Sequence, residues 1–335
     1  MEKLKDYKKN WLTFEQFKEK YQKVPVAEYP NSVLKDIPNP KVSVHIITYQ
    51  HANYIRQAID SVLMQQTDFP FEIIIGDDES TDGTREICIE YAEQYPDKIR
   101  LFLHRRENNI KIMGRPSHIF QYAFNSYNLR GVYVACVSGD DYWSDELKLQ
   151  KQNSFMVKND TYSYCFHSWS KRSLEKKPEI ESSCRVLTMM HRNVFDKLPD
   201  EFFKTIQEDR FLYHILRLEG EKGFVENIRP AYYREHSGGL WSQSKQIYRY
   251  TQSLNTSIQL LNAFKGTPLE RNLNQKIIGR STDILLFEFS KKRSFKPIRT
   301  YFKNISNASN KWKFFWVLSS ISNKLLDLIV KKIKH

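Results

Sequence analysis

Cysteines and long apolar segments are scarce in this chain. The four cysteines, Cys88, Cys136, Cys165 and Cys184, are widely spaced and form no Cys-X-X-Cys pair. We therefore interpret them as reduced core residues of a cytosolic protein. The N-terminal sequence Met-Glu-Lys-Leu-Lys-Asp contains no apolar segment, so we expect no signal peptide.

No segment is long and apolar enough to predict a transmembrane helix. The longest charge-free run near the C-terminus, Phe314 to Asn323, falls well short of the roughly 20 residues that such a helix needs. Helix-turn-helix, zinc-finger and RNP-type signals are also missing, so we do not expect nucleic acid as a partner. The sequence has no internal repeat and no low-complexity tract.

Positive charge is concentrated in the last part of the chain. Residues 291–335 contain twelve Lys or Arg and one acid, Asp327, which gives this segment +11 of the total net charge of +13. The remainder is nearly neutral. The segment also carries apolar residues at helical spacing, namely Phe314, Val317, Leu318, Ile321, Leu325, Leu328 and Ile329. A basic amphipathic helix of this kind suits the surface of an anionic membrane. The alternative is an ordinary helix that packs its apolar stripe on the rest of the protein.

Two adjacent carboxylates follow an apolar strand pattern in the middle of the chain. Residues 132–145 read Val-Tyr-Val-Ala-Cys-Val-Ser-Gly-Asp-Asp-Tyr-Trp-Ser-Asp, which places Asp140 and Asp141 directly after the strand. Two such carboxylates repel each other unless a cation lies beside them. Ligands of open α/β sheets bind beyond the carboxyl ends of the strands, and oxygen ligands suit Mg²⁺ or Mn²⁺. The pattern therefore indicates a cation that carries a phosphate, although Gly-Asp-Asp also fits a solvated turn.

The upstream sequence predicts an α/β fold. Residues 42–48 form a strand pattern, and a helical pattern follows with Ile55, Ala58, Ile59, Val62 and Leu63 on one face. Residues 71–76 read as a second buried strand, which ends in the polar segment 77–83 and precedes a helix over 84–95. This order of strand, helix, strand and helix predicts a parallel, Rossmann-like sheet with right-handed crossovers.

At these residues the chain resembles the family 2 glycosyltransferases, whose catalytic domain has the GT-A fold. Five pieces carry the resemblance, and they occur in the family's order at residues 42–50, 74–84, 139–143, 207–212 and 233–242. One motif is a weak signal, but five in order are specific. The resemblance implies a mostly parallel sheet flanked by helices. We accordingly expect an N-terminal arm at 1–40, a transferase domain at 41–245, and a mainly helical region with the basic tail at 246–335.

The resemblance also implies a site for a nucleoside diphosphate sugar, with uridine as the expected nucleoside. In the family the end of the first strand, here Thr48 and Tyr49, contacts the nucleotide, and Tyr49 is placed to pack against the base. Asp78 matches the carboxylate that accepts a hydrogen bond from a uracil imide. Asp77 would organise the turn, and Asp82 either binds ligand or caps the helix that starts at Thr84.

Asp140 aligns with the last carboxylate of the family's Asp-X-Asp metal motif. The first position of that motif is Ser138, whose hydroxyl can hydrogen-bond a ribose but brings no charge to a metal. We expect Asp140 to be the direct ligand of Mn²⁺ or Mg²⁺, with Asp141 assisting. His236 would approach the diphosphate or the metal, and Arg234 would neutralise phosphate charge. For His236, a purely structural hydrogen bond is the alternative.

Glu208 and Asp209 stand where family members hold the catalytic base, and Asp209 matches that position best. A base there takes the proton from the acceptor hydroxyl during a direct displacement, which inverts the configuration at the anomeric carbon. The alternative is that both carboxylates only favour the positive end of a helix.

Two classes of function fit these residues. The first is an inverting glycosyltransferase that extends a glycan or lipid-linked acceptor, such as a capsular or lipopolysaccharide oligosaccharide, at the cytosolic face of a membrane. The second is a non-catalytic module that binds nucleotide sugar or glycan and retains the fold, which the missing first Asp of the metal motif allows. The presence of Asp78, Asp140, Asp141 and Asp209 together favours the enzyme.

Overall fold

The computed structural model describes residues 7–30, 39–172, 180–236 and 244–292. The chain divides into two compact units, residues 1–242 and 243–335. The first unit contains the sheets and the carboxylates singled out above. The basic tail, including Phe314 to Ile329, lies outside the described residues.

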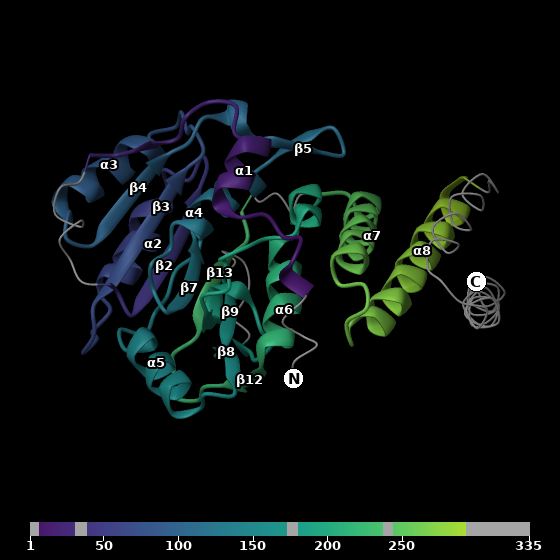
Figure 1. Ribbon diagram of the computed structural model, residues 1–335. Coiled ribbons are helices and arrows are strands. Elements are labelled where there is room, and N and C mark those ends of the chain that lie inside the picture. Colours follow the sequence, from purple (N-terminus) through teal and green to yellow (C-terminus); the bar gives the residue numbers. More distant parts are fainter. Residues whose placement is uncertain (1–6, 31–38, 173–179, 237–243, 293–335) are drawn as a thin grey trace, which may run out of the picture. The chain divides into compact units, whose positions relative to one another are not determined.

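Four parallel strands form the centre of the first unit (Figure 1). They are β2 (Val42–Thr48), β3 (Phe71–Asp77), β4 (Ile99–Leu103) and β7 (Tyr133–Ser138), in the spatial order β4-β3-β2-β7. Nearly every residue of β2 and β3 is buried, because helices cover both faces of a parallel sheet. The α/β fold expected from the alternation of strand and helix patterns is confirmed.

The two faces of these strands pack against different helices. Val42, Val44 and Ile46 share a core with residues of α2 (Ile55–Leu63) and α3 (Thr84–Gln94). Because side chains alternate along a strand, His45 points to the opposite face, where its ring lies 5.0 Å from that of Tyr122 in α4 (Ile119–Tyr127). The helix α4 therefore covers the face that α2 and α3 leave free.

Strands beyond this parallel centre complete the large sheet. The whole order is β1-β4-β3-β2-β7-β11-β8-β12, in which β11 runs antiparallel to both β7 and β8. The added strands are β1 (Ala27–Glu28), β8 (Tyr162–Phe166), β11 (Met190–Arg192) and β12 (Glu221–Phe224). Next to β8 pack α5 (Lys148–Lys158) and α6 (Glu208–Glu219), and α6 carries Glu208 and Asp209 at its start.

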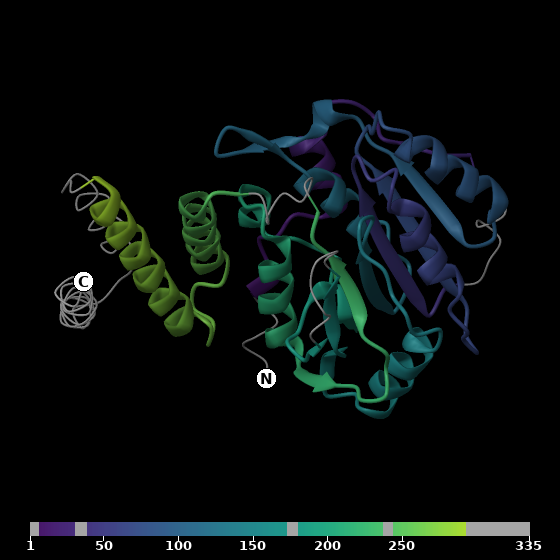
Figure 2. The same cartoon turned by 180° about the vertical axis from the view of Figure 1, so that it is seen from behind.

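Two smaller sheets accompany the large one, and their arrangement can be followed from behind in Figure 2. One has the order β10-β9-β13, and the other is the antiparallel pair β5-β6. Their strands are β5 (Ile110–Ile112), β6 (Arg115–Ser117), β9 (Trp169–Arg172), β10 (Ile180–Glu181) and β13 (Ala231–Arg234). Backbone hydrogen bonds between Tyr142 and Tyr232 link β13 to the segment that follows Asp141. This link brings Arg234 and His236 to the end of β7.

The N-terminal segment packs on the rest of the first unit through α1 (Phe14–Tyr21). This helix starts at Phe14 because Thr13 caps it and accepts a hydrogen bond from the backbone N–H of Gln16. The ring of Phe17, which is fully buried, lies 5.1 Å from that of Phe120 in α4.

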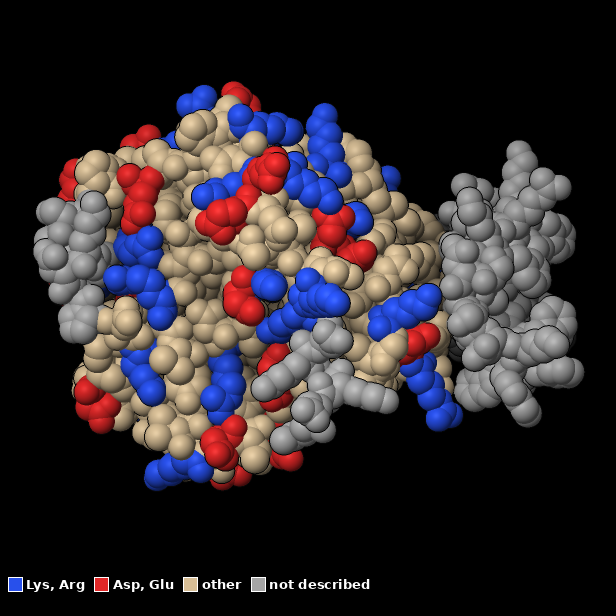
Figure 3. Space-filling view, viewed as in Figure 1, with Lys and Arg blue, Asp and Glu red and all other residues tan. Residues whose placement is uncertain are grey.

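The second unit contains two helices that pack on each other, α7 (Gln246–Ala263) and α8 (Glu270–Lys292). Its buried apolar residues are Leu254, Leu260, Phe264, Leu269, Leu273 and Ile277. No helix among the described residues is long and apolar enough to cross a membrane. Where the structure describes the chain, blue and red side chains are interspersed over the face in Figure 3, in keeping with a nearly neutral body.

Candidate active site

The candidate site lies where the strand order changes direction. From β2 the chain continues to β3 on one side, and later returns to β7 on the other side. The parallel register places Thr48 beside Asp77 and Ile47 beside Ser138, so the carboxyl ends of three strands meet at one edge. Open α/β sheets bind their ligands at such a point.

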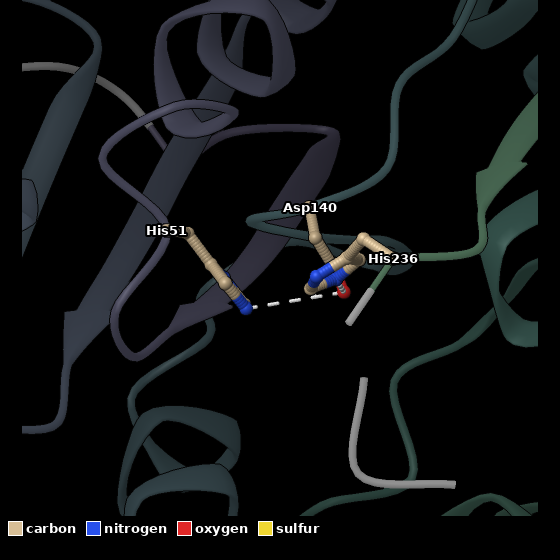
Figure 4. Close-up of side chains that lie close together, drawn as sticks. All are labelled: His51, Asp140 and His236. Carbon is tan, nitrogen blue, oxygen red and sulfur yellow. Dashed lines mark hydrogen bonds and ion pairs between the residues drawn. The ribbon is translucent and has the colours of Figure 1, made fainter. Parts of the chain in front are cut away.

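Asp140 is the centre of a cluster at this edge (Figure 4). Its Oδ2 lies 3.0 Å from His236 Nε2 and 3.9 Å from His51 Nε2. Burial alone would raise the pKa of Asp140, but the hydrogen bond from His236 and the charge of His51 bring that pKa below its ordinary value. The carboxylate is therefore kept ionised, with two imidazoles beside it.

His51 is held in place by the end of β2 and the start of α3. Its Nδ1 lies 3.1 Å from Thr48 Oγ1, and its backbone N–H donates to Thr84 Oγ1 at 2.8 Å. The backbone at Gly139 passes close by, because a Cβ there would lie 2.5 Å from Thr48 Oγ1 and 2.8 Å from His51 Nδ1. A residue with a side chain would therefore displace either His51 or Asp140.

Arg234 connects the end of β13 to the carboxylate of Asp141 and to the backbone of Asp140. Its backbone N–H donates to Asp141 Oδ1 at 2.9 Å, and its Nη1 donates to the backbone oxygen of Asp140 at 2.7 Å. The guanidinium also lies 5.0 Å from the ring centre of Tyr54 and 4.9 Å from that of Tyr142. Burial, with the charge of Asp140, raises the pKa of Asp141 well above its ordinary value. The two neighbouring carboxylates are thus driven to different protonation states.

Asp78 and Tyr49 lie at the ends of β3 and β2. Asp78 Oδ2 accepts hydrogen bonds from Arg106 Nη1 at 3.0 Å and Asn109 Nδ2 at 2.9 Å, whereas its buried Oδ1 has no hydrogen-bond partner among the described residues. Burial raises the pKa of Asp78 to about 6. The Arg106 guanidinium lies 4.2 Å from the ring centre of Tyr49, which is 38% exposed. This leaves a free acceptor near an accessible aromatic ring.

Asp77, the last residue of β3, and Asp82 have structural contacts. Asp77 Oδ2 accepts hydrogen bonds from the backbone N–H of Ser80 and from Arg85 Nε, so it organises the turn as we expected. Asp82 Oδ1 accepts the backbone N–H of Thr84 at 3.1 Å, but the N-cap residue of α3 is Gly83, so Asp82 contacts the start of the helix from one position before the cap.

A second pair of carboxylates starts α6. Glu208 Oε2 lies 3.0 Å from His118 Nε2, and Asp209 Oδ1 accepts the backbone N–H of Arg210 at 2.8 Å. Burial, with the charge of Glu208, raises the pKa of Asp209 to about 6. A carboxyl group with such a pKa can accept a proton near neutral pH.

One cavity of about 560 Å³ joins the two pairs of carboxylates. Its lining includes Ser138, Asp140 and Asp141 after β7, Glu208 and Asp209 at the start of α6, and Arg185, Tyr213 and Tyr233. Thr48, Tyr49, Asp78, Arg234 and His236 are not among its lining residues. Arg234 and His236 reach the cavity through their contacts with Asp140 and Asp141, and Asp78 lies apart beside Arg106.

Sequence reasoning did not single out His51, Arg106, His118 or Arg185. His51 follows Thr48 by three residues, so the rule that strand ends hold the site would have included it. His118, which lies at the start of α4, offers no comparable signal. Arg185 also gives no sequence signal, yet it lines the cavity, and its guanidinium lies 3.8 Å from the ring centre of Trp169.

The arrangement around Asp140 fits a divalent cation. One ligand atom from each of His51, Asp140 and His236 can be chosen so that all three lie within 4.8 Å of one another. Imidazole nitrogen and carboxylate oxygen are common ligands of divalent transition metals. The residues that would hold such an ion therefore come from three separate segments of the chain.

The chain is similar in sequence to several known proteins. An uncharacterized protein of Mycobacterium tuberculosis is 40% identical over 216 residues, which cover 60% of this chain and 60% of that protein. The putative teichuronic acid biosynthesis glycosyltransferase TuaG of Bacillus subtilis is 36% identical over 118 residues, which cover 35% of this chain and 42% of that protein. The chain thus matches 60% or less of the length of these relatives.

A solved structure and a family match complete the comparison. The crystal structure of S. aureus TarS superimposes with a TM-score of 0.54 at 19% identity, over 81% of this chain and 49% of that chain, which indicates a shared fold. Residues 43–211, half of the chain, match the family described as glycosyl transferase family 2. The chain belongs to glycosyl transferase family 2.

Proposed function

We propose that this protein is an inverting glycosyltransferase that uses a nucleoside diphosphate sugar, with uridine as the expected base. The observation that carries the proposal is the cavity whose lining includes both Asp140 and Asp209. The acceptor would be a hydroxyl of a glycan or a lipid-linked glycan. The family membership supports sugar transfer, and the positions of these two carboxylates support the mechanism.

The donor end is assigned to the cluster around Asp140. Asp140 and His236 would hold Mn²⁺ or Mg²⁺, and such an ion, when bound, neutralises charge that develops on the leaving diphosphate. Arg234 would add positive charge at the same place, and Ser138 would hydrogen-bond the ribose. Asp78 would accept the imide N–H of the base through its free Oδ1, next to Tyr49.

The acceptor end is assigned to Asp209. Its carboxylate would take the proton from the acceptor hydroxyl as that oxygen forms its bond to the anomeric carbon. The bond between the anomeric carbon and the diphosphate breaks, and the diphosphate leaves with the bonding electrons. Attack from the face opposite the leaving group inverts the configuration. Glu208 keeps the pKa of Asp209 high by its charge, after the larger contribution from burial.

The biological role that the relatives and the charge of the chain support best is the synthesis of a surface polysaccharide. The relative TuaG is named for teichuronic acid biosynthesis. The basic segment at 291–335 would place the enzyme on an anionic membrane at its cytosolic side, where lipid-linked acceptors are extended. A capsular or lipopolysaccharide glycan fits the same chemistry.

Turnover of nucleotide sugars tests the proposal. The full chain should be incubated with a panel of nucleoside diphosphate sugars, with and without Mn²⁺, while the release of nucleoside diphosphate is measured. We expect metal-dependent release from one donor class. Binding of a donor without any turnover, in the presence of glycan acceptors, would instead support a non-catalytic binding module.

A further inference from the structure

The ligand atoms around Asp140 are spaced almost as a metal ion requires. Ligands at about 2.0 to 2.2 Å from one ion lie roughly 3 to 3.5 Å from each other. His236 Nε2 is 3.0 Å from Asp140 Oδ2, which is within that range, and His51 Nε2 is 3.9 Å from the same oxygen. The latter separation is too long for a hydrogen bond, so no direct bond to Asp140 explains why His51 faces the carboxylate.

The surroundings of His51 favour a metal-binding tautomer. A hydrogen on Nδ1 can be donated to Thr48 Oγ1 at 3.1 Å, which leaves the lone pair of Nε2 directed to the side of Asp140. Histidine ligands of metals characteristically donate their other ring N–H to a neighbouring acceptor in this way. The backbone of Gly139 leaves the space that this arrangement needs.

The charge and the ligand types of the cluster also affect which ion it would bind. Ser138 provides no carboxylate, so Asp140 is the one negative side chain in the group of three. Two imidazoles and one carboxylate form a set that suits divalent first-row transition metals, whereas Mg²⁺ prefers oxygen ligands and loses its water reluctantly. Three protein ligands would not fill the coordination of such an ion, so oxygens of a diphosphate could bind it as well.

We propose that His51 is the third protein ligand of the cation and that it makes the site selective for Mn²⁺, Co²⁺ or Zn²⁺ over Mg²⁺. The inference rests on the cation of the proposed function, and it narrows that cation to ions that accept imidazole nitrogen more readily than Mg²⁺ does. His51 thereby supplies the ligand that a first aspartate at position 138 would otherwise provide.

Metal binding to the full chain tests this directly and needs no turnover. Electron paramagnetic resonance measures free Mn²⁺ during a titration, and visible absorption reports nitrogen ligation of Co²⁺; both are recorded with and without a nucleoside diphosphate. We expect the wild type to bind Mn²⁺ at least about tenfold more tightly than Mg²⁺. His51→Ala should weaken Mn²⁺ at least about tenfold and reduce the Co²⁺ bands, with a smaller effect on Mg²⁺.

Two further variants control for an effect of the substitution on folding. Asn53→Ala changes an exposed residue of the same loop and should bind metal as the wild type does. His51→Asp replaces nitrogen by oxygen, so the preference for Mn²⁺ over Mg²⁺ should fall about tenfold while binding persists. An unchanged Mn²⁺ affinity in His51→Ala would overturn the inference, as would an unchanged preference in His51→Asp.

The outcomes separate this inference from the proposed function. His51-dependent Mn²⁺ binding without turnover of any nucleotide sugar would support the metal site and contradict the proposed transfer. Turnover that depends on Asp140, together with wild-type Mn²⁺ binding by His51→Ala, would support the transfer and overturn the role of His51.

Discussion

Asp140 and Asp209 are both largely buried, but their surroundings move their pKa values in opposite directions. The imidazoles of His236 and His51 outweigh burial at Asp140 and lower its pKa, whereas burial and the charge of Glu208 raise the pKa of Asp209 to about 6. Residues with such separated pKa values usually have separate roles in catalysis. A permanent anion suits a metal ligand, and a carboxyl that titrates near pH 6 suits a base.

Removing the charge of Asp140 tests the first role. Asp140→Asn should lower turnover by about a hundredfold or more, because the amide binds a cation far less well and charge on the leaving diphosphate is then poorly stabilised. Metal-dependent nucleotide affinity should fall as well, while the urea midpoint of unfolding changes little. Asp97→Asn, which changes an exposed aspartate outside the site, is the matched control. Wild-type turnover in Asp140→Asn would refute the assignment.

The pH dependence of kcat tests the second role. Asp209 acts only when it is deprotonated, so kcat should fall as the pH drops below about 6. Glu208→Gln removes a negative neighbour and lowers the pKa of Asp209, which should move this acidic limb to lower pH by up to about one unit. The measurement is kcat at saturating donor between about pH 5 and about pH 8.

Asp209→Asn provides the control for that profile. It should remove most of kcat and leave donor affinity unchanged, because the carboxylate acts on the acceptor. Asp209 is not the base if the acidic limb of the kcat profile keeps its pH in Glu208→Gln. The same holds if Asp209→Asn strongly weakens donor binding.

At the scale of elements, strand ends were the part of the site that could be predicted. The patterns at 42–48, 71–76 and 132–138 correspond closely to β2, β3 and β7, because buried strands have continuous apolar runs. Asp78 and Asp140 follow these strands directly, so local sequence was sufficient to find them.

Pairing between distant segments could not be predicted in the same way. The position of β11 between β7 and β8, and the parallel contact of β13 with β9, depend on packing that short apolar patterns do not encode. His118, before the start of α4, meets Glu208 at the start of α6, and Arg185 lines the cavity from another segment of the chain. Local sequence encodes neither position. His236 was predicted from the motif resemblance and not from the periodicity of apolar residues.

The tight turn after β7 gives a prediction at this scale. In Gly139→Ala the new Cβ would meet Thr48 Oγ1 and His51 Nδ1 at 2.5 and 2.8 Å, so the loop must shift. We expect a loss of about 1 to 3 kcal/mol in the free energy of unfolding, together with a strong loss of turnover. Urea unfolding and a donor turnover assay measure the two effects. Gly279→Ala in α8, where a Cβ meets nothing within 4 Å, should lower neither the free energy of unfolding nor turnover.

At the scale of the whole molecule, the distribution of charge separates a nearly neutral body from a basic tail. Residues 291–335 account for +11 of the net +13, and blue and red are interspersed over the described body in Figure 3. We propose that the positive part of the chain attaches the enzyme to an anionic membrane, whereas the body contains the candidate site.

A chain that ends at Asn310 tests the tail. Basic residues near an anionic membrane contribute roughly 1 kcal/mol each, and salt screens this attraction. The full chain should sediment with anionic vesicles at low salt and less at high salt, whereas the shortened chain should stay in solution and still use soluble acceptors. Equal vesicle binding by both chains would refute the membrane role, and an insoluble shortened chain would favour packing of the apolar stripe on the protein.

The most direct test of the account is the anomeric configuration of the product during turnover. Nuclear magnetic resonance of the glycosidic linkage, with a donor found in the nucleotide-sugar panel, reports whether Asp209 directs a single displacement. We predict an inverted configuration relative to the donor, formed by the wild type and lost in Asp209→Asn. A product that retains the donor configuration would contradict the proposal that Asp209 acts as the base of a single displacement.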